Sequence, residues 1–78
     1  MLKFNMVDKK EGKVLYEYFP EGGTESGVVS FDEKSGDVSI ESLAKNDRHE
    51  RYAVKMFKRI REMASKGTFD KEGIVAWY

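Results

Sequence analysis

The chain has 78 residues, in which 14 Lys and Arg balance 14 Asp and Glu, and it contains no cysteine. This length accommodates one domain, covering residues 1–78. The absence of cysteine excludes a disulfide framework, a cysteine-ligated zinc site and a thiol nucleophile. Hydrophobic residues make up 40% of the sequence, which is enough for a core, and the 36% of charged residues predict a well-hydrated surface.

Neither end of the sequence has the character of a targeting or membrane segment. The first residues carry charges at Lys3 and Asp8 and lack the apolar run of a secretory signal. No window approaches the roughly 18 apolar residues of a membrane-spanning helix. We therefore expect a cytoplasmic protein that does not engage a membrane.

The first part of the chain alternates between apolar and polar residues, as half-buried strands do. Leu2, Phe4 and Met6 alternate with polar residues and predict a first strand. The other segments with strand character are 13–19, 28–32, 38–42 and 74–78. The sequence thus predicts five strands.

Three connections between expected elements share a pattern, in which an apolar residue is followed in order by Asp, Lys and Gly. The glycines of the three connections are Gly12, Gly36 and Gly73. Asp accepts hydrogen bonds from backbone amides in turns, and Gly takes the positive φ that a tight reversal needs. We interpret the similarity as shared turn chemistry and not as an internal repeat, because it is confined to the turns.

Residues 47–66 have the period of an amphipathic helix. Asn46 or Asp47 is a candidate N-cap, with Glu50 in capping-box position relative to Asp47. Lys66 and Gly67 provide a cation and a glycine at the C-terminal end. The expected core-facing stripe consists of Ala53, Phe57, Ile60 and Ala64, flanked by Tyr52, Met56 and Met63.

The predicted fold class is α+β with the order β-β-β-β-α-β. If the first four strands form a meander, the helix returns the chain so that strand five runs antiparallel to strand one. Placing strand five beside strand one gives a mainly antiparallel sheet of order 5-1-2-3-4, with the helix on one face. Parallel pairing of strand five with strand four is the alternative, because a helical crossover commonly joins parallel strands.

The residue types that support catalysis are sparse. His49 is the only histidine. It has no partner at ligand spacing, and we expect it to be half-buried near the first helical turn. The carboxylates of Glu17, Asp32 and Glu41 fall on neighbouring strands with the polar alternation of a solvated sheet face. An acid–base pair there is the less favoured alternative.

The glycine-rich segment 21–27 precedes a strand and contains two glutamates. A phosphate-binding loop would need a helix N-terminus and a cation, so we interpret this segment as a connection between strands. We expect no enzymatic activity, no cofactor, no metal ion and no small-molecule ligand.

Charge is unevenly distributed along the chain despite the balanced total. Residues 47–66 carry seven cations and three anions, a net charge of +4, residues 1–46 carry −3 and residues 67–78 carry −1. The basic helix has three interpretations: a solvated face, a face for an acidic protein partner, or a nucleic-acid-binding ridge. The candidate nucleic-acid contacts are Arg51, Lys55, Lys58, Arg59 and Lys66.

The last five residues contain no charged side chain and are expected at a sheet edge, where uncharged strands favour pairing with another chain. Apolar residues on both faces of the second and fifth strands suggest that part of the sheet away from the helix is covered. The candidate interface consists of Tyr16, Tyr18, Val75, Trp77 and Tyr78. The sequence thus favours a non-enzymatic interaction or self-association module, with a homodimer as the expected assembly.

Overall fold

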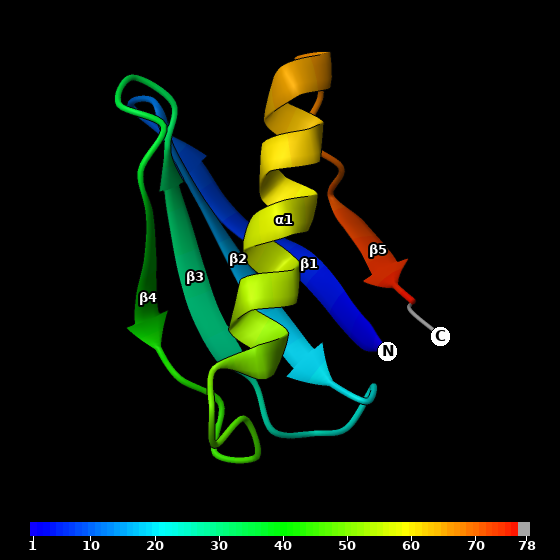
Figure 1. The fold of residues 1–78 in the computed structure, drawn as a ribbon. Helices are drawn as coiled ribbons and strands as arrows, with labels where there is room; N and C mark the ends of the chain where they lie inside the picture. The colour runs from blue at the N-terminus through cyan, green and yellow to red at the C-terminus, as the bar shows by residue number, and fades with distance from the viewer. Residues whose placement is uncertain (77–78) are drawn as a thin grey trace.

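The computed structural model describes residues 1–76 and shows a five-stranded antiparallel sheet with one helix packed across one face (Figure 1). The elements are β1 (Leu2–Lys10), β2 (Lys13–Pro20), β3 (Gly27–Asp32), β4 (Val38–Ser42), α1 (Arg51–Lys66) and β5 (Glu72–Val75). The predicted α+β class and element order are confirmed. Within the described residues, α1 is neither long enough nor apolar enough to span a membrane.

The strand order is β4-β3-β2-β1-β5, which confirms the predicted order and excludes the parallel alternative for the last strand. β5 runs antiparallel to β1, with Leu2 opposite Val75 and Phe4 opposite Gly73. The strand begins at Glu72, two residues before the predicted 74–78 segment, whose residues 77–78 lie outside the described part of the chain. Figure 1 shows β4 and β5 at the two edges of the sheet, with α1 in front of the central strands.

The core lies between α1 and one face of the sheet. On β2, the even-numbered residues face the helix, and the odd-numbered set that includes Glu17 faces the other way. The rings of Phe4 and Tyr16 meet edge to face, with centroids 5.5 Å apart. The buried hydrophobic residues are Leu2, Phe4, Val14, Tyr16, Tyr18, Val29, Phe31, Ala44, Ala53, Met56, Ile60 and Met63.

The buried stripe of α1 is rotated from the predicted one. Met56 and Met63 are buried with Ala53 and Ile60, whereas Phe57, which we expected within the core-facing stripe, is only partly buried. The two methionines lie seven residues apart and therefore project to nearly the same side of the helix. Their flexible side chains fill the space above the sheet.

The helix begins at Arg51, four residues after the predicted start. Glu50 adopts a left-handed conformation with φ of 58°, so the preceding residues form a turn and Glu50 makes no capping-box bond. The N-cap residue is Glu50 and not the predicted Asn46 or Asp47. The carboxylate of Asp47 nevertheless accepts hydrogen bonds from two backbone N–H groups of the first turn, those of Tyr52 (3.1 Å) and Ala53 (3.0 Å). His49 lies in the turn and is exposed, not half-buried, because the helix has not yet begun there.

The end of the helix agrees with the prediction. Gly67 adopts a φ of 75°, and its N–H donates to the carbonyl of Ala64. The predicted turn glycines Gly12 and Gly36 also have positive φ. The third expected turn glycine, Gly73, is instead a residue of β5, so that prediction is wrong.

A buried polar contact ties the beginning of α1 to the sheet. The hydroxyl of Tyr18 on β2 donates to the carboxylate of Asp47 (3.1 Å) and accepts from the backbone N–H of Ala44 (3.2 Å). Tyr18 is fully buried and Asp47 is 1% exposed. Buried polar groups are costly unless they are paired, so these bonds fix where the helix starts.

We predict that Asp47→Ala lowers the free energy of unfolding by about 2–4 kcal/mol, because it removes a helix cap and leaves the buried Tyr18 hydroxyl without its acceptor. The measurement is a urea denaturation curve. Asp37→Ala, which alters an exposed aspartate in the turn between β3 and β4, is the control and should change stability by no more than about 0.5 kcal/mol. Equal effects of the two substitutions would contradict the anchoring role of Asp47.

We further predict that Met56→Ala costs about 2–5 kcal/mol, because it opens a cavity under the helix. Val54 lies on the outer side of α1 with 58% of its surface exposed, so Val54→Ala should cost less than about 0.5 kcal/mol. Thermal or urea denaturation of both variants tests the helix orientation. A larger loss for Val54→Ala than for Met56→Ala would show that the helix faces the sheet differently.

Candidate functional site: a basic groove beside the last strand

The structure places the predicted interface residues in different environments. Tyr16 and Tyr18 are fully buried beneath α1, so the expectation that they form an exposed interface is wrong. Side chains alternate between the two faces of β2, so Glu17 faces away from the helix and the two tyrosines face towards it. Val75 is partly buried on the helix side of β5, and Trp77 and Tyr78 lie outside the described residues.

The three carboxylates considered for acid–base chemistry have separate hydrogen-bond donors. Glu17 accepts from the side-chain amide of Asn5, and Glu41 accepts from the hydroxyl of Ser30. Asp32 accepts from backbone N–H groups within the turn that follows β3. These contacts give each carboxylate a structural role and do not pair any two of them.

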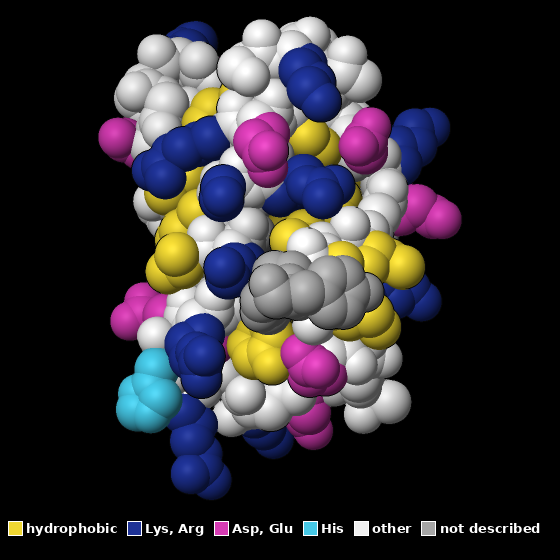
Figure 2. All heavy atoms as spheres, turned by 45° about the vertical axis from the view of Figure 1, so that its right-hand side comes forward, with side chains coloured by type: hydrophobic (Ala, Val, Ile, Leu, Met, Phe, Trp, Pro, Cys, Tyr) yellow, Lys and Arg dark blue, Asp and Glu magenta, His cyan; other side chains and the backbone are white. Residues whose placement is uncertain are grey.

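A groove runs between α1 and β5, and we call it the α1–β5 groove. It comprises two neighbouring pockets of about 400 and 230 Å³ that share Arg59 and Glu62 in their walls. The smaller pocket lies against Val75, and the larger one lies against Thr68 and Asp70 in the segment before β5. Figure 2 shows Lys and Arg side chains along this side of the molecule, with hydrophobic surface between them. The lining residues are Lys55, Lys58, Arg59, Glu62, Met63, Lys66, Thr68, Asp70, Val75 and Ala76.

Four of the five predicted nucleic-acid contacts line this groove, namely Lys55, Lys58, Arg59 and Lys66. The fifth, Arg51, is exposed at the start of α1 and is not among the lining residues. The lining carries four cations against two carboxylates, so the groove is net basic. The cations predicted on an outer ridge of the helix therefore gather on the flank that meets β5.

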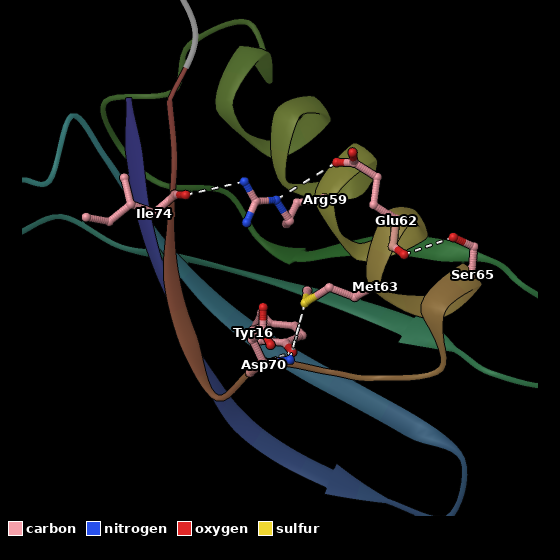
Figure 3. A network of polar contacts seen from close by, with 7 residues as sticks. All are labelled: Tyr16, Arg59, Glu62, Met63, Ser65, Asp70 and Ile74. Carbon is pink, nitrogen blue, oxygen red and sulfur yellow. Dashed lines mark hydrogen bonds and ion pairs between the residues drawn. The ribbon is translucent and has the colours of Figure 1, made fainter.

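Arg59 connects the helix to the last strand (Figure 3). Its Nη2 donates to the carbonyl oxygen of Ile74 at 3.4 Å, and its Nε lies 3.9 Å from a carboxylate oxygen of Glu62. The guanidinium group also lies 5.8 Å from the centroid of the Phe4 ring, within the range of a cation–π contact. The guanidinium group of Arg59 thus reaches the edge of β5 that does not pair with β1.

The backbone of β5 presents hydrogen-bonding groups on its outer edge. β1 donates a backbone N–H to the carbonyl of Lys71 at 2.7 Å. Bonded pairs alternate along an antiparallel ladder, so Gly73 and Val75 also bond to β1, whereas Glu72 and Ile74 direct their N–H and C=O groups away from it. The bond from Arg59 to Ile74 agrees with this assignment. No described strand pairs with the outer edge.

A second buried tyrosine holds the far end of the groove. The Tyr16 hydroxyl donates to the backbone carbonyl of Asp70 and lies 3.8 Å from the sulfur of Met63, which also accepts from the N–H of Asp70 (Figure 3). Burial raises the pKa of Tyr16 to about 12, with a smaller contribution from the Asp70 carboxylate. These contacts fix the segment between α1 and β5. Sequence reasoning missed the two contacts of Tyr16, because nothing in the local pattern links residues 47 or 54 positions apart.

We predict that stability falls as pH rises from 10 towards 12. Burial raises the pKa of Tyr16 and of Tyr18 from 10.0 to about 12 in the folded state. A raised folded-state pKa means that the stabilisation is complete below pH 10 and is lost as the pH approaches 12. Urea midpoints measured across this range should decline for the native sequence and decline less for Tyr16→Phe. A decline in Tyr16→Phe as steep as that of the native sequence would contradict the assignment.

Among the described residues, no group of three or more His, Cys, Asp or Glu side chains is placed to hold a metal ion. The distinctive feature of the α1–β5 groove is the combination of a basic helix flank and an open strand edge. Comparison of the chain with protein-family models, with curated proteins and with solved structures found no match.

Proposed function

We propose that this protein is a non-enzymatic cytoplasmic interaction module that binds an acidic segment of a partner protein in the α1–β5 groove. The observation that carries the proposal is the position of Lys55, Lys58 and Arg59 beside the outer edge of β5. The cations favour an acidic ligand, and the strand edge supplies hydrogen-bonding groups suited to a polypeptide.

The charge distribution supports a partner of opposite sign. The helical segment 47–66 carries a net charge of +4 in a chain of zero net charge. Because the excess positive charge lies on one element, it attracts an acidic segment to that side of the molecule. Screening by salt should weaken this attraction, since Lys58 is exposed and Arg59 is only partly buried.

A second copy of the chain is a less suitable occupant of the β5 edge. Pairing of two β5 strands across a two-fold axis would make a continuous sheet with both helices on the same face. The basic flank of each α1 would then face the basic flank of the other across the new strand pair. Like charges brought together in this way disfavour the homodimer that the sequence suggested, relative to an acidic partner.

Nucleic acid is the second candidate, because four of the five predicted contacts line one groove. Phosphates could bind the same cations. However, none of the described lining residues is aromatic, so the groove lacks the stacking surfaces that usually accompany single-strand binding. The strand edge also has no function in such a complex. These two features favour the acidic polypeptide.

We predict that a fluorescently labelled hexaglutamate peptide binds the protein at about 20 mM salt and binds more weakly as salt increases. Lys58→Ala should weaken binding about 2- to 5-fold, the effect of removing one exposed ion pair. Arg61→Ala is the matched control, because Arg61 is an exposed cation of α1 that does not line the groove. Fluorescence anisotropy titrations provide the measurement.

Equal losses in Lys58→Ala and Arg61→Ala would contradict the groove as the binding site, and no binding at low salt would overturn the proposed function. A labelled oligothymidylate serves as the rival probe. Tighter binding of the oligonucleotide than of hexaglutamate, with loss in Lys58→Ala, would support the nucleic-acid alternative. A dimer mass in light scattering that Lys58→Ala increases would support self-association through β5.

A further inference from the structure

We infer that the partner segment binds as an additional antiparallel β-strand on β5 and carries two acidic residues separated by one apolar residue. The inference rests on the proposed function and specifies the chemistry of its ligand. It follows from the direction of the backbone groups on β5, the faces to which its side chains point, and the position of the α1 cations.

The backbone of β5 has the groups that strand addition requires. Ile74 directs its N–H and C=O outward, and its carbonyl already accepts a hydrogen bond from Arg59 at 3.4 Å. A ligand residue opposite Ile74 would exchange both backbone hydrogen bonds with it. Arg59 would then release the carbonyl and turn its guanidinium to a ligand carboxylate, which is a stronger acceptor for that group.

The pleat of the sheet determines which ligand side chains meet the helix. Residues opposite each other in a ladder point to the same face, so ligand residues opposite Gly73 and Val75 face α1. These two ligand positions are separated by one residue. The nearby helix cations are Lys55, Lys58 and Arg59, which share a pocket wall with Val75. Two acidic side chains at alternate positions therefore match the basic flank.

Gly73 lets the ring of Phe4 pack directly against β5 on this face. A Cβ atom at Gly73 would lie 2.7 Å from the ring of Phe4, so only glycine fits against the buried ring. The guanidinium of Arg59 lies 5.8 Å from the centroid of the same ring, so a ligand residue opposite Gly73 would lie near this cation. The glycine that the sequence suggested as a turn residue thus allows close packing of Phe4 against the strand.

The intervening ligand residue would lie on the opposite face of the sheet, beside Ile74. Ile74 is 54% exposed, and the residue opposite it on β1 is Lys3. The apolar side chain of Ile74 is therefore open to solvent on the face of the sheet away from α1. An apolar ligand side chain would cover part of this surface. The resulting order is acidic, apolar, acidic, which a chain bound by charge alone would not require.

The test compares two peptides of identical composition, one with a single isoleucine between two glutamates and the other with the two glutamates adjacent. We expect the alternating peptide to bind about 3- to 10-fold more tightly in isothermal titration calorimetry, since only it places both carboxylates on the helix side. Lys58→Ala should reduce this preference, and the control Arg61→Ala should leave it unchanged.

Backbone methylation separates strand addition from side-chain recognition. N-methylation of the central isoleucine removes the N–H that would donate to Ile74 and should weaken binding about 2- to 10-fold. N-methylation of a flanking glutamate alters an N–H that points away from β5 and should have a smaller effect. Equal effects of the two methylations would overturn the strand geometry.

The failure of the inference is distinguishable from that of the proposed function. Equal affinities of the two peptides, or binding of hexaglutamate without binding of either peptide, would overturn the strand inference while an acidic ligand remains supported. Absence of binding by both peptides and by hexaglutamate would overturn the proposed function and the inference together.

Discussion

The hydrogen bond between the hydroxyl of Tyr18 and the carboxylate of Asp47 determines how α1 lies on the sheet. The same carboxylate accepts the backbone N–H groups of Tyr52 and Ala53, so one buried group joins β2 to the first turn of the helix. A buried carboxylate without these donors would be costly, and the arrangement therefore has little freedom to shift. This contact therefore fixes the beginning of α1 against β2.

The opposite end of α1 is held by Tyr16, two residues before Tyr18 on the same face of β2. Its hydroxyl contacts the sulfur of Met63 and the carbonyl of Asp70, and so fixes the segment that leads into β5. These contacts hold both ends of the helix in an orientation in which Met56 and Met63 face the core. In this orientation Arg59 reaches the carbonyl of Ile74 at the outer edge of β5, and four cations of the helix line the two pockets of the α1–β5 groove.

Much of the fold could be predicted from the sequence, because it depends on local patterns. The alternation of apolar and polar residues identified the strands, and the alternating strand directions of a meander predicted their order in the sheet. Gly67 correctly predicted the end of the helix. The start of the helix was misplaced because the left-handed conformation of Glu50 has no sequence signal of its own. The two tyrosines were assigned to the wrong face, although Glu17 between them indicated which set of residues faces solvent.

The site was only half visible in the sequence. The basic residues could be listed from composition and helical spacing, but their meeting with β5 depends on long-range contacts such as that between Arg59 and Ile74. From the sequence, the basic helix was compatible with a solvated face, an acidic partner or nucleic acid as alternatives, whereas a groove beside an open strand edge favours a polypeptide.

The central claim, that an acidic strand adds to the edge of β5, is tested most directly by residue-specific amide hydrogen exchange. In the free protein, the amides of Glu72 and Ile74 should exchange faster than those of Gly73 and Val75, which bond to β1. The alternating peptide should slow exchange at Ile74 and leave Gly73 largely unchanged. Protection confined to the exposed side of α1, with Ile74 still exchanging rapidly in the complex, would contradict the account.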